Sequence, residues 1–137
     1  MEPSAKVLKA IRQKMEKGWS EETGYELYNS EPNSPIGQCF VSSLFAFIEL
    51  KQFHPAIVSG VVEGFDEDHF WLEINNKILD FTADQFGTAL FPKVVFAPYD
   101  KYPMYKPIKS IKDIGYFQGD SGLERFALLI EQIYNTP

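Results

Sequence analysis

The sequence predicts a single α+β domain over residues 1–137, in which a central helix packs on a small antiparallel sheet between an N-terminal and a C-terminal helix. Three patterns support this fold class. The stretch that follows Cys39 is apolar nearly all round, as in a buried helix. A β-branched run and a hairpin pattern come next. Amphipathic helical patterns stand near both ends of the chain. With 137 residues, 45% of them hydrophobic, there is enough material for one core and little room for a second domain.

The first helix is expected from residue 4 to about residue 18. Its apolar positions recur at helical spacing and are Val7, Leu8, Ile11 and Met15. Its opposite side is basic and carries Lys6, Lys9, Arg12, Lys14 and Lys17. We interpret this side as a solvated helix face, because runs of charge on a helix usually face water.

The central helix is expected to begin just before the single cysteine, Cys39, where a loop of turn-forming residues gives way to apolar ones. Ser34 can cap this helix and Pro35 suits its first position. The free N–H groups and the dipole at a helix start favour negative charge, and therefore the nucleophilic thiolate. Most lone cysteines are core residues, so a catalytic role for Cys39 depends on partners further along the chain.

The sheet is expected to start with the β-branched run 56–64 and to continue through a hairpin within residues 68–82. Further strands are expected over 92–98 and within 108–117, and residues 99–106 are expected to form a tyrosine-rich loop that lines a cleft or packs on the core. An amphipathic helix after Ser121 closes the fold.

The hairpin pattern places a base beside a carboxylate. If Asn75-Asn76 forms a two-residue loop, Trp71 lies opposite Asp80, and His69 shares their face of the sheet. His69 and Asp80 are then diagonal neighbours that can hydrogen-bond. Cys39, His69 and Asp80 together predict a nucleophile, its base and the carboxylate that orients the base. A three-residue loop would instead send Asp80 to the opposite face.

The same residues resemble the transglutaminase-like core, a relative of the papain fold. Residues 37–41, Gly-Gln-Cys-Phe-Val, are similar to the Gly-Gln-Cys-Trp-Val motif around the transglutaminase nucleophile. Residues 69–73 are similar to the family's His-x-Trp-x-Glu, and residues 79–85 to its Asp-x-Thr-Pro-Gln segment, with Ala83-Asp84 where a proline would stand. The resemblance spans about residues 35–86 and implies a Cys-His-Asp triad of Cys39, His69 and Asp80.

Further site residues are less well defined. Papain-like enzymes often use a polar side chain just before the nucleophile to bind the oxyanion, and transglutaminases use an upstream aromatic N–H or O–H. The candidates for oxyanion or substrate binding are Gln38, Asn33, Trp71 and Gln85, with Trp19 and Tyr28 as further aromatic candidates. Packing or turn chemistry explains several of these equally well. The backbone N–H of Cys39 is the safest oxyanion donor.

Composition excludes several classes of function. A formal charge of −6 argues against a nucleic-acid surface. The sequence has no signal peptide and no apolar run of ~20 residues, so we expect no membrane span and a cytoplasmic location, in its own cell or in a host cell that receives it. One cysteine and two histidines without chelating spacing predict neither a metal nor another cofactor.

Three functions remain open. The first is a cysteine-dependent amide hydrolase, either a peptidase or a glutamine deamidase, that acts on a protein or peptide through a thioester acyl-enzyme. The second is a transglutaminase, in which an amine replaces water as the acyl acceptor. The third is a protein- or peptide-binding module that keeps the fold without catalysis. Because the chain is small, we expect water to be the acceptor. The sequence does not indicate an oligomeric state.

Overall fold

The computed structural model describes residues 1–25, 32–65 and 67–135. Within these ranges the helices are α1 (Ala5–Gly18), α2 (Cys39–Glu49) and α3 (Gly122–Asn135), and the strands are β1 (Ala56–Val62), β2 (Asp68–Ile74), β3 (Lys77–Asp80), β4 (Val95–Pro98) and β5 (Tyr105–Ile111). The predicted α+β class is confirmed. In these ranges no helix combines the length and the apolar character needed to span a bilayer.

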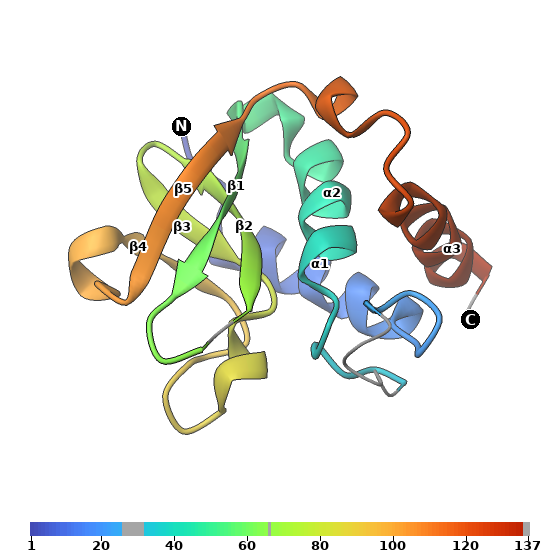
Figure 1. Cartoon of the computed structure of the whole chain (residues 1–137), viewed down its shortest axis with the longest axis horizontal. Coiled ribbons are helices and arrows are strands. Elements are labelled where there is room, and N and C mark those ends of the chain that lie inside the picture. The colour runs from blue at the N-terminus through green and yellow to red at the C-terminus, as the bar shows by residue number, and fades with distance from the viewer. Residues whose placement is uncertain (26–31, 66, 136–137) are drawn as a thin grey trace.

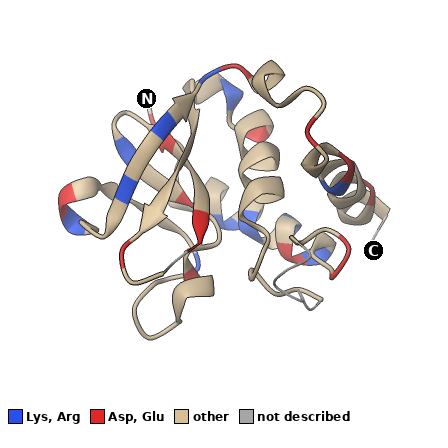
Figure 2. Ribbon diagram, in the orientation of Figure 1, with Lys and Arg blue, Asp and Glu red and all other residues tan. Residues whose placement is uncertain are grey.

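The five strands form one antiparallel sheet in the order β4-β3-β2-β1-β5. The last strand of the chain, β5, pairs with the first strand, β1, and lies at an edge (Figure 1). Lys106, Pro107 and Lys109 stand on β5, and the two lysines appear as blue bands in Figure 2. Lysine and proline discourage an edge strand from pairing with another chain.

Helix α2 is central, as the sequence predicts. It packs against β1 and β2 on one side and against α1 and α3 on the other (Figure 1). Its residues 40–46 are buried, and Val41 and Leu44 expose nothing to solvent, whereas Ile48 near its end is exposed. Helix α1 contributes Leu8, Ile11 and Met15 to the same core. This packing fixes the position of Cys39, the first residue of α2, relative to β1 and β2.

The opposite face of the sheet has a second, smaller core. Its buried members include Val58, Trp71, Ile78, Phe91 and Tyr105. Residues 99–106 help to cover this face through the short 3-10 helix Tyr99–Lys101 and the start of β5. The packing role left open for the tyrosine-rich stretch is therefore the observed one, and Tyr105 begins a strand rather than continuing a loop.

The hairpin has the predicted register. Ile74 pairs with Lys77 and Leu72 pairs with Leu79 across a two-residue loop. Asn75 and Asn76 have φ values of 53° and 62°, the left-handed backbone that a type I′ turn requires at both central positions. Since side chains alternate along a strand, this register puts the side chain of Asp80 on the same face as His69.

Candidate active site

Cys39 is the first residue of α2. Gly37, just before it, has a φ of 78°, in the left-handed region that favours glycine. Because the chain leaves helical geometry there, the prediction that Ser34 caps the helix with Pro35 at its first position is wrong. The Ser34 hydroxyl instead accepts a hydrogen bond from the backbone N–H of Ile36 at 3.3 Å, within the preceding turn.

This start of the helix leaves a backbone hydrogen-bond donor at Cys39. Backbone N–H groups in the first turn of a helix have no acceptor within the helix. The N–H of Cys39 is one of these groups, so it can donate to the oxygen of a carbonyl that the Cys39 sulfur attacks.

His69 on β2 and Asp80 on β3 form a buried pair on the hairpin. Nε2 of His69 lies 2.7 Å from Oδ2 of Asp80. Each residue is about 1% exposed. Since a carboxylate accepts hydrogen bonds, Nε2 carries the proton and Nδ1 is the nitrogen that remains for Cys39.

The imidazole also interacts with the thiol. Burial disfavours a charged ring, but the interactions with the carboxylate of Asp80 and the sulfur of Cys39 outweigh it and raise the pKa of His69 to about 10. Burial alone would raise the pKa of Asp80, yet the contact with His69 keeps it below its usual value. Both shifts favour a charged pair, which is the arrangement that activates a cysteine nucleophile.

Two further residues hold the Asp80 carboxylate. Its Oδ1 accepts from the backbone N–H of Thr82 at 2.9 Å and from the Thr82 hydroxyl at 3.2 Å. Its Oδ2 accepts from the Tyr105 hydroxyl at 2.6 Å. Burial and the neighbouring Asp80 raise the pKa of Tyr105, so this hydroxyl stays a donor. Sequence reasoning missed the role of Tyr105, which lies on another strand.

Gln85 reaches the second nitrogen of His69. Its Nε2 lies 3.0 Å from Nδ1, and its Oε1 accepts from the backbone N–H of Gly37 at 3.4 Å. Gln85 belongs to the short 3-10 helix Ala83–Phe86 that follows β3. The structure thus brings Gln85 to His69, the predicted base.

The side chain of Gln38 points away from solvent and bonds to the turn before α2. This side chain is fully buried. The Gln38 carbonyl oxygen accepts from the Thr23 hydroxyl at 2.8 Å, and its amide nitrogen donates to the backbone oxygen of Ser20 at 2.9 Å. This amide therefore anchors the turn at residues 20–24 to the start of α2.

The aromatic N–H candidates are also engaged. Nε1 of Trp19 donates to the Ser42 hydroxyl at 2.9 Å. Nε1 of Trp71 donates to the Tyr99 hydroxyl at 3.0 Å, and the Trp71 ring packs 5.8 Å from the imidazole. Trp71 therefore forms part of the wall beside His69. Tyr28 lies outside the described residues.

Asn33 does not line the cavity beside Cys39. It has a φ of 63° and lines a surface pocket along α1 together with Lys14 and Lys17. Its backbone N–H donates to the backbone oxygen of Trp19 at 3.1 Å. Asn33 has turn geometry here.

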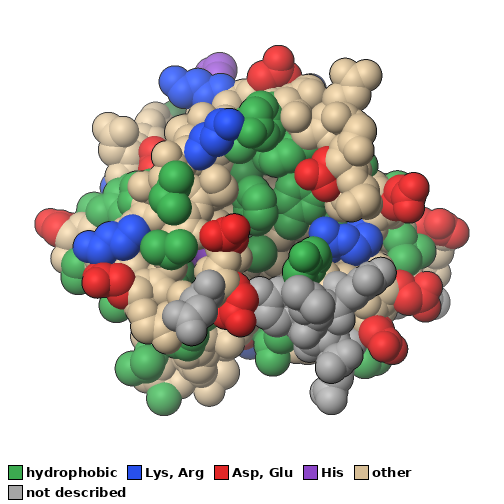
Figure 3. All heavy atoms as spheres, in the orientation of Figure 1, with side chains coloured by type: hydrophobic (Ala, Val, Ile, Leu, Met, Phe, Trp, Pro, Cys, Tyr) green, Lys and Arg blue, Asp and Glu red, His purple; other side chains and the backbone are tan. Residues whose placement is uncertain are grey.

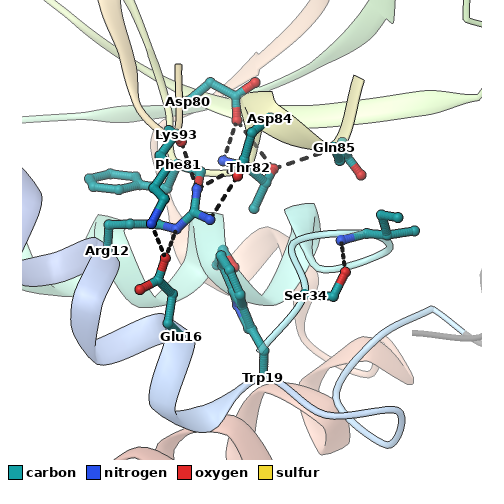
Figure 4. A network of polar contacts seen from close by, with 12 residues as sticks. Arg12, Glu16, Trp19, Ser34, Asp80, Phe81, Thr82, Asp84, Gln85 and Lys93 are labelled. Carbon is teal, nitrogen blue, oxygen red and sulfur yellow. Dashed lines mark hydrogen bonds and ion pairs between the residues drawn. The ribbon is translucent and has the colours of Figure 1, made fainter. Parts of the chain in front are cut away.

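A buried arginine ties the segment that follows β3 to α1 (Figure 4). Arg12 makes a bidentate ion pair with Asp84, with Nη1–Oδ1 and Nη2–Oδ2 distances of 2.8 and 2.9 Å. Nη1 also donates to the backbone oxygens of Phe81 and Lys93, at 3.0 and 2.8 Å. Its guanidinium lies 4.7 Å over the Trp19 ring. Arg12 is 4% exposed, so its assignment to a solvated basic face is wrong; partners from a distant loop draw it inward.

A cavity of about 330 Å³ opens beside Cys39. Its aromatic walls are Tyr25, Phe40 and Phe70, and its charged residues are Glu67, Asp68, Asp120 and Arg125. Figure 3 shows apolar side chains gathered in a hollow between the sheet and α3, with acidic side chains around it. Three carboxylates against one guanidinium make the cavity net negative.

The negative cavity should select alkylating reagents by charge. We compare the rate of alkylation by the cation 2-bromoethylamine with the rate of alkylation by the anion iodoacetate. The ratio of these two rates should be about tenfold higher at Cys39 than at a small free thiol, because surface charge changes the rates of charged reagents by this order. The measurement is the rate of mass gain with each reagent. With one cysteine in the chain, every adduct reports the same sulfur.

A matched pair of variants separates local from net charge. Glu67→Gln with Asp68→Asn should remove most of the preference. Asp100→Asn with Glu131→Gln makes the same change of net charge away from the cavity lining and should leave the preference in place. Equal ratios in the two double variants would contradict this prediction.

Among the described residues, no group of three or more His, Cys, Asp or Glu side chains is arranged to hold a metal ion.

The comparisons with known proteins give one match. A family model described as YunG protein matches residues 7–106. No curated protein and no solved structure matches the chain. The matched segment covers most of the chain and includes the whole polar network from Arg12 to Tyr105. The chain therefore belongs to the YunG protein family.

Proposed function

We propose that this YunG-family protein is a cysteine-dependent amide hydrolase, a peptidase or a glutamine deamidase, that works through a thioester acyl-enzyme. One observation carries the proposal. Cys39, at the start of a helix, interacts with a buried imidazole whose Nε2 lies 2.7 Å from the buried carboxylate of Asp80. Nucleophile, base and orienting carboxylate are the parts that cysteine acyl transfer needs.

In the first half-reaction, the thiol proton of Cys39 passes to Nδ1 of His69 and the sulfur attacks the amide carbon. The carbonyl oxygen gains the negative charge and can accept from the backbone N–H of Cys39. The C–N bond then breaks, and the leaving amine or ammonia takes the proton from Nδ1. A thioester to Cys39 remains.

In the second half-reaction, water attacks the thioester carbon and gives a proton to His69. The C–S bond breaks, the carboxylic acid leaves, and the Cys39–His69 pair is restored. Asp80 stays ionised throughout and stabilises the imidazolium in both halves.

The architecture supports a transglutaminase-like relative of the papain fold. The helix that starts at the cysteine packs on an antiparallel sheet, and the sheet carries His69 and Asp80 in the family's chain order. At two positions the sequence differs from the transglutaminase motifs, and each of these two residues makes a specific contact in the structure. Phe40 replaces tryptophan and packs edge-on against Phe70, and Asp84, where a proline would stand, pairs with Arg12.

The substrate in this proposal is a protein or peptide that reaches Cys39 from the aromatic cavity. Water is the acyl acceptor in this proposal, and an amine acceptor is its alternative. A transglutaminase or a binding module on the same fold would give different products in the assays below.

His69→Ala should abolish the enhanced reactivity of the thiol. In wild type we expect iodoacetamide to label Cys39 at about pH 6 at least about tenfold faster than a free thiol, because a paired histidine keeps part of the sulfur as thiolate. The variant should lose this excess rate. The measurement is the rate of adduct formation against pH by mass spectrometry.

His54→Asn is the matched control. His54 is the other histidine of the chain, is exposed, and has a φ of 54° that asparagine tolerates. It should leave the pH profile unchanged. Slow labelling in wild type, or equal labelling in wild type and His69→Ala, would refute histidine activation and favour the binding module.

Products then decide the reaction. Wild type, but not Cys39→Ala, should release ammonia from glutamine-containing peptides or create new peptide ends. If the acyl group were instead transferred to a lysine amine, with little hydrolysis, the protein would be a transglutaminase.

A further inference from the structure

The hydrogen bonds around Gln85 fix which way its amide points. The backbone N–H of Gly37 can donate but not accept, so the atom it meets at 3.4 Å is the amide oxygen of Gln85. The hydroxyl hydrogen of Thr82 is used on the Asp80 carboxylate. The Thr82 oxygen is therefore an acceptor for Nε2 of Gln85, at 3.4 Å.

Both neighbours direct the amide nitrogen of Gln85 towards His69. Its N–H then donates to Nδ1 at 3.0 Å, which requires that Nδ1 carry no proton. Nε2 carries the ring proton and gives it to Asp80 at 2.7 Å. The two contacts together select the neutral imidazole in a single tautomer.

The groups that face the imidazole from other elements act in the opposite sense. Asp80 from β3 and Cys39 from α2 favour the imidazolium. Tyr105 from β5 donates to Asp80, with its ring 6.3 Å from the imidazole. A proton on Nδ1 would face the N–H of Gln85 directly, so Gln85 has to turn away when the ring is charged.

We propose that Gln85 is a positioning residue that sets where the proton lies between Cys39 and His69: its amide favours the thiol and neutral imidazole, against Asp80, which favours the thiolate and imidazolium. The proposal rests on the proposed function, in which this proton moves from sulfur to ring. Gln85 must release Nδ1 as the proton arrives, and the released amide returns when the ring is neutral again.

Two substitutions test this assignment. Gln85→Met keeps the length of the side chain and removes the donor. Gln85→Glu keeps an oxygen for Gly37 and places an acceptor at Nδ1. Both should move the pair towards imidazolium, the second further than the first. Gln118→Met, at an exposed position, is the control for loss of a glutamine.

The readout is the ¹⁵N spectrum of the histidine ring in the intact protein. With two histidines in the chain, the His54→Asn variant assigns the signals. We expect the Nδ1 shift of His69 near neutral pH to move towards the protonated position in Gln85→Met and further in Gln85→Glu. The labelling rate of Cys39 at about pH 6 should rise about fivefold in Gln85→Met, the factor that corresponds to one lost hydrogen bond of about 1 kcal/mol.

The outcomes separate this proposal from the proposed function. An Nδ1 shift that is the same in wild type and both Gln85 variants, or a shift equal to that of Gln118→Met, would overturn the role of Gln85. The proposed function would stand in that case if His69→Ala still removed the enhanced labelling. Conversely, shifts that follow Gln85 in a protein that hydrolyses no amide would uphold the proton balance and refute the hydrolase.

Discussion

Asp80→Asn should reduce kcat for amide hydrolysis by about 10³- to 10⁴-fold, the loss typical of an orienting carboxylate in a catalytic triad. The reason is the tautomer of His69. An asparagine amide can turn its nitrogen to Nε2, which leaves the proton on Nδ1, where the base has to be free. Loss of the carboxylate also removes the charge that raises the pKa of His69, so the imidazolium becomes less stable.

The same variant can be measured before a substrate is known. The labelling rate of Cys39 at about pH 6 should fall towards that of a free thiol. In the ¹⁵N spectrum, Nε2 of His69 should change from a protonated to an unprotonated nitrogen. These two readouts report on the base itself and would not respond to a loss of stability alone.

Tyr105→Phe is the matched comparison. It removes one of the donors to Asp80 and leaves the carboxylate with His69 and Thr82. We expect kcat for amide hydrolysis to fall by about tenfold in this variant. A hydrogen bond to a charged group contributes about 1.5–3 kcal/mol, and the remaining donors compensate in part. An Asp80→Asn enzyme that keeps more than a third of the wild-type rate would exclude a triad role for Asp80.

Arg12→Met should lower the free energy of unfolding by about 3–5 kcal/mol, the usual cost of removing one partner of a buried ion pair. The side chains of Arg12 and Asp84 are 5% and 8% exposed, so the stranded carboxylate gains little from water. The backbone oxygens of Phe81 and Lys93 would lose a donor as well. Methionine keeps the apolar stem beside Trp19. Urea unfolding followed by circular dichroism measures the change.

Two comparisons make the Arg12 result specific. Lys14→Met on the same helix breaks an exposed pair with Glu49 and should cost no more than about 1 kcal/mol. Asp84→Asn in the Arg12→Met background should recover part of the stability, because it removes the unpaired charge. Similar losses for Lys14→Met and Arg12→Met would refute the buried-anchor interpretation.

The His69–Asp80 contact could be predicted because it is local. A two-residue Asn-Asn loop fixes the register of a hairpin, and the register fixes which side chains share a face. The start of α2 was less accessible to prediction. Ser34 and Pro35 are residues that often start a helix, but the left-handed backbone at Gly37 prevents a helix from beginning there. This backbone conformation depends on how the loop packs, which the sequence does not show.

Arg12 and Tyr105 could not be assigned from the sequence because their partners are distant. Arg12 stands among four lysines with nearly the same pattern, and Asp84 lies 72 positions further on. One signal was present: Arg12 follows Leu8 by four residues and so borders the apolar face, and a guanidinium suits buried ion pairs better than an ammonium. For Tyr105 no such local signal exists.

The hydroxyl of Tyr105 has a consequence for synthesis of the protein. A nascent chain that ends before this residue already contains Cys39, His69 and Asp80, but it lacks β5, which pairs with β1 and supplies the tyrosine beneath the carboxylate. Domains fold largely as units as they leave the ribosome. If Cys39 is the nucleophile that we propose, it would therefore acquire its complete set of partners only when β5 docks, and an unfinished chain would carry Cys39 without them.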